Sequence, residues 1–238
     1  MSNRARSPLL ENLVVDRRGG PQQTIVAELR RLILNGDAPP GTSVPLGEVA
    51  DLFGVSHIPI REALKTLISE GLVTHRPNSG YSVAQLTVQE LYELYIVRES
   101  LEMAAQTHAI VRATEEDREV AKVANERMRQ AIRDGDAAAI QRENRNFHLA
   151  LARPSGMRRL LRMLEVAWNM IEPSQPLRRF DPADIARLND DHDEMLDAFL
   201  ARDAARLRML SERHAHSLND DIVALPTDSG TGMLARDD

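Results

Sequence analysis

The segment of residues 54–64, GVSHIPIREAL, constrains the fold more than any other part of this chain. Gly54 suits a tight turn, and Ser56 stands where the N-cap of a following helix is expected, with an oxygen to offer a backbone N–H. Pro59 falls in the first turn of that helix, where its missing N–H is tolerated. The pattern predicts the turn and second helix of a helix-turn-helix, with DNA as the first partner to consider.

The flanking sequence completes a winged domain. Apolar periodicity and β-rich runs predict three helices and then two strands, over residues 22–34, 45–53, 57–70, 72–76 and 81–84. The turn between the two strands is Pro77-Asn78-Ser79-Gly80. Three helices followed by a hairpin predict a winged helix-turn-helix domain over residues 21–85.

The rest of the chain has a different pattern. Beyond residue 85 every sustained segment has a period near 3.6 residues and no strand signal occurs. Helices are expected over residues 88–112, 115–134, 136–152, 156–171, 182–201 and 203–221. The fold class is therefore mostly α, with an all-helical bundle over residues 86–222 for effector binding and dimerisation. Residues 1–20 and 223–238 have little apolar periodicity, and we expect a disordered arm and a disordered tail.

The charge of the chain is divided unevenly. The net charge is −6, but residues 1–85 carry nine Lys/Arg against eight Asp/Glu, and residues 86–238 carry twenty-one against twenty-eight. The acidity therefore belongs to the helical part. A DNA-binding domain with so little positive charge neutralises few phosphates, so dimerisation and base contacts must supply much of its affinity.

Composition also limits the classes of site. The chain has no cysteine, which excludes disulfides and thiolate ligands, so any metal must use histidine, carboxylate or amide groups. No apolar run approaches the roughly 20 residues of a membrane span, and the N-terminus has charges where a signal peptide needs apolar residues. We expect a soluble cytoplasmic protein that has no membrane partner.

These motifs resemble the GntR family of bacterial transcription regulators. The N-terminal signature comprises Pro40-Gly41, Leu46, Glu48-Val49-Ala50, Phe53 to Ser56, Pro59 to Leu64, Glu70 to Val73 and Gly80. The helical part resembles the FCD ligand-binding domain of the FadR-like branch. Its motifs are Tyr95 to Arg98, Glu102, Asn144 to His148, Asp191-His192 and His214. Together the two resemblances cover roughly residues 22 to 220.

The resemblance implies a homodimeric transcription regulator, more commonly a repressor than an activator and not an enzyme. Its winged domains would read two half-sites of a near-palindromic double-stranded DNA operator. The expected DNA contacts are Ser56, His57, Ile58, Pro59 and Arg61 at the start of the recognition helix, Lys65 on the face of Arg61, and Ser79 and Gly80 at the wing tip. His57 and Gly47 stand where many members have arginine. Histidine offers a base edge one donor at best, so the operator is expected to differ from the usual one.

A metal site is implied in the helical domain. Asn144 and His148 are four residues apart on one helix, a spacing that suits two ligands of one metal. The resemblance adds His192 and His214, and implies a divalent cation of zinc, nickel or manganese type. Three imidazoles and one oxygen leave two octahedral positions for water or a ligand carboxylate. Family members usually have Asp at the position of Asn144, so this site should hold its cation more weakly and depend on an anionic effector.

The resemblance assigns effector binding to Arg98, whose planar guanidinium can hold the carboxylate of a small organic acid. The alternative is a structural salt bridge to Glu99 or Glu102. Three further residues are assigned to the same cavity or to plain core packing: Trp168, Asn169 and Met170. His108 and His216 match no motif, and we expect them to be structural or exposed.

Two other functions are compatible with the sequence. Three histidines around an open cation are also a catalytic-zinc pattern, which would make the protein a metal-dependent hydrolase. Against it, no glutamate follows a ligand in a base-supplying motif. Alternatively, the histidines fill the bundle and the regulator binds a bulky acyl-type effector without metal.

Overall fold

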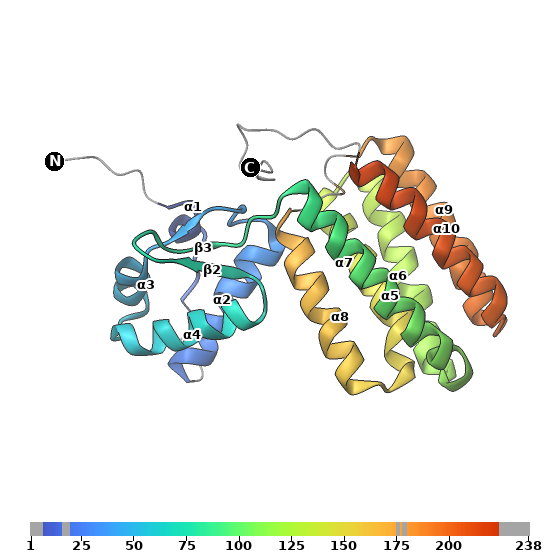
Figure 1. Ribbon diagram of the computed structural model, residues 1–238, viewed down its shortest axis with the longest axis horizontal. Helices are drawn as coiled ribbons and strands as arrows, with labels where there is room; N and C mark the ends of the chain where they lie inside the picture. Colours follow the sequence, from blue (N-terminus) through green and yellow to red (C-terminus); the bar gives the residue numbers. More distant parts are fainter. Residues whose placement is uncertain (1–6, 16–19, 175–176, 178–179, 224–238) are drawn as a thin grey trace. The chain divides into compact units, whose positions relative to one another are not determined.

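The computed structural model describes residues 7–15, 20–174, 177 and 180–223 (Figure 1). It divides into two compact units, and the main break along the chain falls between Thr87 and Val88. No helix among the described residues is long and apolar enough to cross a membrane. The internal structure of each unit is described separately below.

Unit 1 is the predicted winged helix-turn-helix. Its described elements are α1 (Pro8–Glu11), α2 (Pro21–Asn35), β1 (Ser43–Val44), α3 (Leu46–Phe53), α4 (His57–Ser69), β2 (Val73–Arg76) and β3 (Gly80–Val83). The core lies where α2, α3 and α4 meet the sheet, and Ile25, Leu29, Ile60 and Leu64 are fully buried in it. The three predicted helices and both predicted strands are confirmed, with bounds that differ by one or two residues.

The sheet has one strand more than predicted. Its order is β1-β3-β2 and both pairings are antiparallel, with His75 opposite Tyr81 and Arg76 opposite Gly80. The additional strand, β1, pairs Ser43 with Ser82. A strand of two residues is too short to show alternation in the sequence, and only pairing with β3 makes it visible.

The prediction of a disordered arm over residues 1–20 is wrong for its middle part. Leu9 and Leu10 of α1 are 0% and 8% exposed and belong to the same core as α2 and α4. The Ser7 hydroxyl donates to the backbone oxygen of Ser43 at 2.8 Å, and the Val14 N–H donates to Glu28 at 2.7 Å. Four helical residues have no readable period, so only their packing reveals the element. Residues 1–6 and 16–19 of the predicted arm lie outside the described residues.

Unit 2 is the predicted helical domain. It contains α5 (Val88–Arg112), α6 (Glu115–Asp134), α7 (Ala137–Ala152), α8 (Arg158–Ile171), α9 (Pro182–Leu200) and α10 (Ala204–Val223). A single 3-10 turn at Arg153–Ser155 follows α7 in this unit, while the 3-10 turn after α8, at Glu172–Ser174, is assigned to unit 1. All six predicted helices are present. The predicted tail, residues 223–238, lies outside the described residues except for Val223, which ends α10.

Local signals explain where several of these helices begin and end. Thr114 caps α6 in a capping box with Asp117, and Gly135 ends the helix in a left-handed conformation. Asp136 accepts from the Ala139 N–H as the N-cap of α7, so it precedes the helix that we predicted to include it. Asp181 caps α9 in the same way. Two of these helices, α7 and α9, carry buried histidines, and the caps determine where each of them begins.

Candidate metal centre and DNA-recognition helix

The recognition helix of unit 1 is α4. Gly54 has a left-handed backbone (φ 67°), which lets the chain turn from α3 into the extended residue Ser56. His57 begins the helix, and the side chains of His57, Ile58 and Arg61 are exposed. Ile58 is 72% exposed, the highest value among the large apolar side chains of the described residues. The first turn of α4 is thus free to enter a major groove.

Ser56 occupies the N-cap position of α4, but its side chain makes no capping hydrogen bond. The prediction that its oxygen caps the helix is therefore wrong. An N-cap oxygen accepts from the N–H of the second or third helical residue, and the third residue here is Pro59, which has no N–H. The Ser56 hydroxyl makes no bond to the helix end and stays available to another partner.

Lys65 lies on α4 as expected, but its charge is not independent. Its Nζ donates to Glu62 Oε1 at 2.8 Å, and this hydrogen bond raises the pKa of Lys65. The pair is exposed, so salt screens it and a phosphate can compete for the ammonium group. Among the described contacts Lys65 forms an ion pair and Arg61 forms none, so Arg61 offers the more accessible positive charge on this face.

The wing consists of β2, β3 and the turn between them. Asn78 and Gly80 have positive φ angles of 68° and 83°, and the Ser79 N–H donates to the Arg76 oxygen at 3.1 Å. Ser79 and Gly80 are exposed at the tip of the hairpin. The structure places both residues as the sequence predicts, and their contact with DNA stays a prediction.

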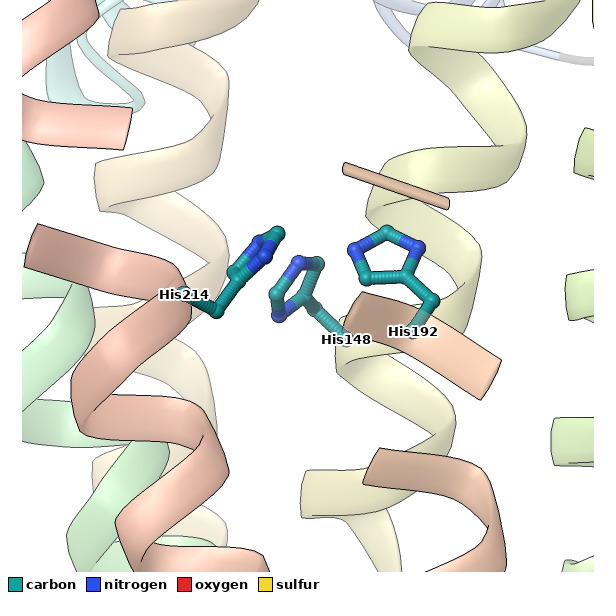
Figure 2. Close-up of side chains that lie close together, drawn as sticks. All are labelled: His148, His192 and His214. Carbon is teal, nitrogen blue, oxygen red and sulfur yellow. The ribbon is translucent and has the colours of Figure 1, made fainter. Parts of the chain in front are cut away.

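Three histidines converge in the interior of unit 2 (Figure 2). His148 comes from the last turns of α7, His192 from the middle of α9 and His214 from α10. Their exposed fractions are 2%, 0% and 2%, and each ring offers a ligand atom within 4.8 Å of those of the other two. The rings come from helices that are far apart in sequence, so the bundle itself builds this cluster.

The chemistry of this cluster fits a metal ion. The Nε2 atoms of all three rings are buried and have no hydrogen-bond partner among the described residues. Burial, with added repulsion from nearby positive groups, lowers the pKa of His192 well below 6.5. Burial also lowers the pKa of His214 to about 4, although Asp191 opposes the shift. The lowered pKa values of His192 and His214 favour the neutral imidazole, which is the form that coordinates divalent cations, and the unpartnered ring nitrogens are free to do so.

Two carboxylates orient the rings from outside the cluster. Glu102 of α5 has its Oε2 3.1 Å from His148 Nδ1, and Asp191 Oδ2 lies 3.3 Å from His214 Nδ1. The Asp191 contact is a hydrogen bond and leaves Nε2 of His214 to coordinate a metal, whereas the Glu102 contact is an ion-pair distance at which His148 Nδ1 makes no hydrogen bond. Burial opposes ionisation of Glu102, but His148 and Arg98 outweigh it and lower the pKa of the carboxyl group.

Glu102 and Asp191 belong to the motifs of the helical part, but their positions in the sequence do not indicate that they contact the histidine rings. A charged residue in the middle of an apolar helix face was the available signal for Glu102. No local signal existed for Asp191, because it is adjacent to His192 in sequence and yet serves His214 on another helix.

Arg98 lies next to the histidine cluster and is 1% exposed. Its guanidinium carbon is 4.3 Å from the ring centre of Tyr95 and 4.6 Å from that of Trp168, so two aromatic faces hold it. Its Nε is 3.7 Å from Glu102, yet Nε and Nη1 have no hydrogen-bond partner among the described residues. The predicted alternative of a salt bridge to Glu102 is thus present, but it leaves donors of Arg98 unused.

Of the other predicted positions, some lie in the interior of unit 2 and others are exposed. Asn144 is 5% exposed and lies one turn before His148 on α7. Trp168 is fully buried, and its Nε1–H donates to Glu102 Oε1 at 3.0 Å, so it supports the cluster as well as the core. Asn169 accepts from Arg145 at 2.8 Å. His108 and His216 are exposed and lie outside the cluster.

Comparison with known families identifies both units. The model described as FCD domain matches residues 93–217, more than half of the chain. The model described as bacterial regulatory proteins, gntR family, matches residues 21–83. The two matches follow the two units of the structure.

Similar proteins have the same description. YdhC, an HTH-type transcriptional regulator of Bacillus subtilis (strain 168), is 34% identical over 58% of this chain and 62% of its own length, under two thirds. McbR of Escherichia coli (strain K12) is 28% identical over 74% of this chain and 80% of its own length. The transcriptional repressor GlaR of the same organism is 27% identical over 78% and 88%. These relatives are transcription regulators and not enzymes, which speaks against a hydrolase.

Solved structures show the fold again. The chain aligns with E. coli McbR/YncC at a TM-score of 0.75 and 24% identity, over 86% of this chain and 98% of the other. A GntR regulator from Rhodococcus sp. RHA1 gives a TM-score of 0.76 at 22% identity, over 86% and 99%. These structures share the fold of this chain, a winged helix-turn-helix domain and a helical domain. Together with the two family matches, this shows that the chain belongs to the GntR family of bacterial transcription regulators with an FCD domain.

Proposed function

We propose that this regulator is a cytoplasmic homodimeric repressor whose helical domain holds a divalent metal ion and binds a small organic acid. His148, His192 and His214 would hold the metal, with Asn144 as an oxygen ligand. Arg98 would bind the carboxylate of the acid. The observation that carries the proposal is a cluster of three buried imidazoles whose ligand atoms lie within 4.8 Å of one another, each ring having a buried Nε2 without a hydrogen-bond partner among the described residues.

A buried nitrogen without a hydrogen-bond partner destabilises the folded state by about 1–3 kcal/mol. Several such nitrogens in one place therefore support the presence of a ligand. Three in one place are rare in folded proteins unless an ion or water pairs with them. When bound, a divalent cation of zinc, nickel or manganese type would supply a Lewis-acid centre for an oxygen ligand. Glu102 and Asp191 keep the coordinating nitrogens aimed inward.

The charges around the cluster favour an anionic effector. Arg98 carries one positive charge and Glu102 one negative charge, both buried. Imidazoles that coordinate a metal ion are neutral, as is the amide of Asn144, so a bound divalent cation would leave two uncompensated positive charges. Buried charge is stable only when it is paired. A small carboxylate meets this need, and the free Nε and Nη1 donors of Arg98 suit its oxygens.

On the DNA side, the exposed first turn of α4 and the wing tip would read each half-site. His57, Ile58 and Arg61 would contact base edges, while Lys65 would contact a phosphate. Two copies related by a two-fold axis would match a near-palindromic operator. An effector alters DNA affinity only to the extent that it binds the operator-binding and non-binding conformations with different affinity. The coupling free energy between two such sites is usually about 1–3 kcal/mol.

Metal analysis tests the proposal. Full-length protein purified without chelator, then dialysed with zinc, nickel or manganese, is expected to bind one cation per chain. His192→Ala should abolish this stoichiometry, whereas His216→Ala, which changes an exposed histidine two residues past a proposed ligand, should retain it.

The second measurement is operator binding with a panel of organic acids, with and without metal. An acid that alters operator affinity only in the metal-loaded protein would support the full proposal. Absence of any bound cation, together with a response to acyl compounds, would replace it with the metal-free acyl regulator.

A further inference from the structure

The winged domain has little unpaired positive charge to offer to DNA. Residues 20–85 carry five Lys/Arg against six Asp/Glu. Three of the five basic residues are in ion pairs: Arg30 with Glu70 at 2.6 Å, Arg31 with Glu28 at 2.8 Å and Lys65 with Glu62 at 2.8 Å. Among the described contacts only Arg61 and Arg76 have no ion pair. Because phosphate contacts supply much of the affinity of a DNA-binding protein, we searched the same domain for further cations.

Helix α1 fixes the start of the N-terminal segment beside the sheet. The Ser7 hydroxyl donates to the backbone oxygen of Ser43 at 2.8 Å, and Ser43 of β1 pairs with Ser82 of β3 (Figure 1). Leu9, two residues later, is fully buried in the domain core. Gly80 at the wing tip stands two residues before Ser82, about 7 Å along the strand. Ser7 is therefore held next to the strand that leads to the wing tip.

Strand β1 also leads to the start of α3. Val44 lies opposite Tyr81, Pro45 is the N-cap of α3, and Gly47 follows in the first turn. A Cβ at Gly47 would have no atom within 4 Å apart from its own helix and chain neighbours, so the surface above this turn is open. Many members of the family have arginine at the position of Gly47. A positive charge is thus absent at a place that β1 connects to Ser7.

Two arginines precede the anchor at Ser7. Arg6 is adjacent to it and Arg4 is three residues away. An extended chain spans at most about 3.3–3.6 Å per residue, so the backbone of Arg4 lies no more than about 11 Å from that of Ser7. Residues 1–10 contain no acidic residue that could neutralise these two charges. The anchor therefore keeps two cations in the neighbourhood of the wing and the start of α3.

We propose that Arg4 and Arg6 bind phosphates of the operator backbone, between the DNA segments contacted by the wing and by the first turn of α3. They would supply the positive charge that residues 20–85 lack, including the one absent at Gly47. Tethering by α1 holds them at a high effective concentration beside the bound DNA. The proposal rests on operator binding by the winged domain and adds two contacts to it. Contacts with phosphates carry no base information, so these arginines raise affinity without changing the preferred sequence.

Salt dependence tests this role in the full-length protein. The probes are a duplex selected from a randomised pool by the wild type and a random-sequence duplex of equal length. Arg4→Gln/Arg6→Gln should weaken binding to both by a similar factor and should lower the slope of log affinity against log salt by about 1.8 per bound chain. Between about 50 and 200 mM salt, the wild type should therefore lose about 12-fold more affinity per chain than the variant.

Two matched variants separate position from net charge. Arg4→Lys/Arg6→Lys keeps both charges and should keep the wild-type slope, since lysine also binds phosphate. Arg17→Gln/Arg18→Gln removes the same charge just after the segment of α1, where the Val14 N–H donates to Glu28 of α2 and the chain leads away from the sheet. This second pair should change the slope less than Arg4→Gln/Arg6→Gln does. Urea midpoints of all variants are measured alongside, so that lost DNA affinity is not confused with lost folding.

Directed cleavage locates the contact on DNA. The chain has no cysteine, so Ala5→Cys provides a unique thiol for an iron–EDTA group between the two arginines. We expect this group to cut the selected duplex at a few nucleotides on the wing side of each half-site, whereas the free reagent cuts the whole duplex evenly.

The outcomes distinguish the proposal from the function on which it rests. A wild-type slope in Arg4→Gln/Arg6→Gln, an equal change in Arg17→Gln/Arg18→Gln, or even cleavage from position 5 would refute the phosphate contacts and leave operator binding intact. If the wild type selects no sequence from the pool, operator binding itself fails, and the proposal fails with it.

Discussion

Glu102 is the residue whose substitution tests the buried cluster most directly. One carboxylate serves three neighbours: His148 Nδ1 at 3.1 Å, the Nε1–H of Trp168 at 3.0 Å and Arg98 Nε at 3.7 Å. Glu102→Gln keeps the shape and an oxygen for Trp168, but it removes the negative charge. Arg98 then remains in the interior without a counter-charge among these contacts.

The magnitude follows from these contacts. Removing one partner of a buried ion pair costs about 3–5 kcal/mol, and the retained bond to Trp168 argues for the lower end. With a slope of about 1–3 kcal/mol per molar urea, the unfolding midpoint should fall by at least roughly 1 M. Metal affinity should fall about 10–100-fold, because His148 loses the carboxylate that orients it.

Urea unfolding followed by circular dichroism and metal calorimetry measure the two effects. Glu93→Gln on the exposed face of α5, where the Glu93 carboxylate accepts from Gln89 at 3.0 Å, is the matched control. Adding Arg98→Met to Glu102→Gln removes both charges and should recover most of the stability but not the metal affinity. Wild-type unfolding and wild-type metal affinity in Glu102→Gln would refute the role assigned to this carboxylate.

Three further predictions follow from other parts of the molecule. Leu9→Ala should lower the free energy of unfolding by about 2–5 kcal/mol, because Leu9 is fully buried, whereas Val14→Ala should change it little since Val14 is 63% exposed; equal urea midpoints would contradict the packing of α1. Ile58→Ala should weaken operator binding most where a thymine methyl faces position 58, and unaltered base preference in a randomised-site selection would exclude this contact. In chelated protein, the lowered pKa of His214 predicts a loss of up to about 3 kcal/mol between pH 6.5 and 4, because the unfolded chain binds protons that the buried ring does not; urea midpoints that do not fall over this interval would oppose it.

Most of unit 1 could be predicted from sequence because its signals are local. Gly54 and Pro59 punctuate the chain within a few residues of the helix that they delimit. The elements that were missed, α1 and β1, are four and two residues long and are stabilised by contacts with distant residues. The expected cap at Ser56 is absent, and Pro59 removes one of the two N–H groups, those of the second and third helical residues, that a cap can use.

The candidate site shows the same division more sharply. By itself the sequence determined where the helices of unit 2 lie, which family the chain resembles and which histidines are candidate metal ligands. Periodicity and motif spacing, on which these predictions depend, are properties of neighbouring residues. Only the tertiary structure decided that Asp191 contacts His214 and that Glu102 contacts His148. These relations depend on the direction and register of packed helices, which arise from burial of side chains across the bundle and leave no trace in local sequence.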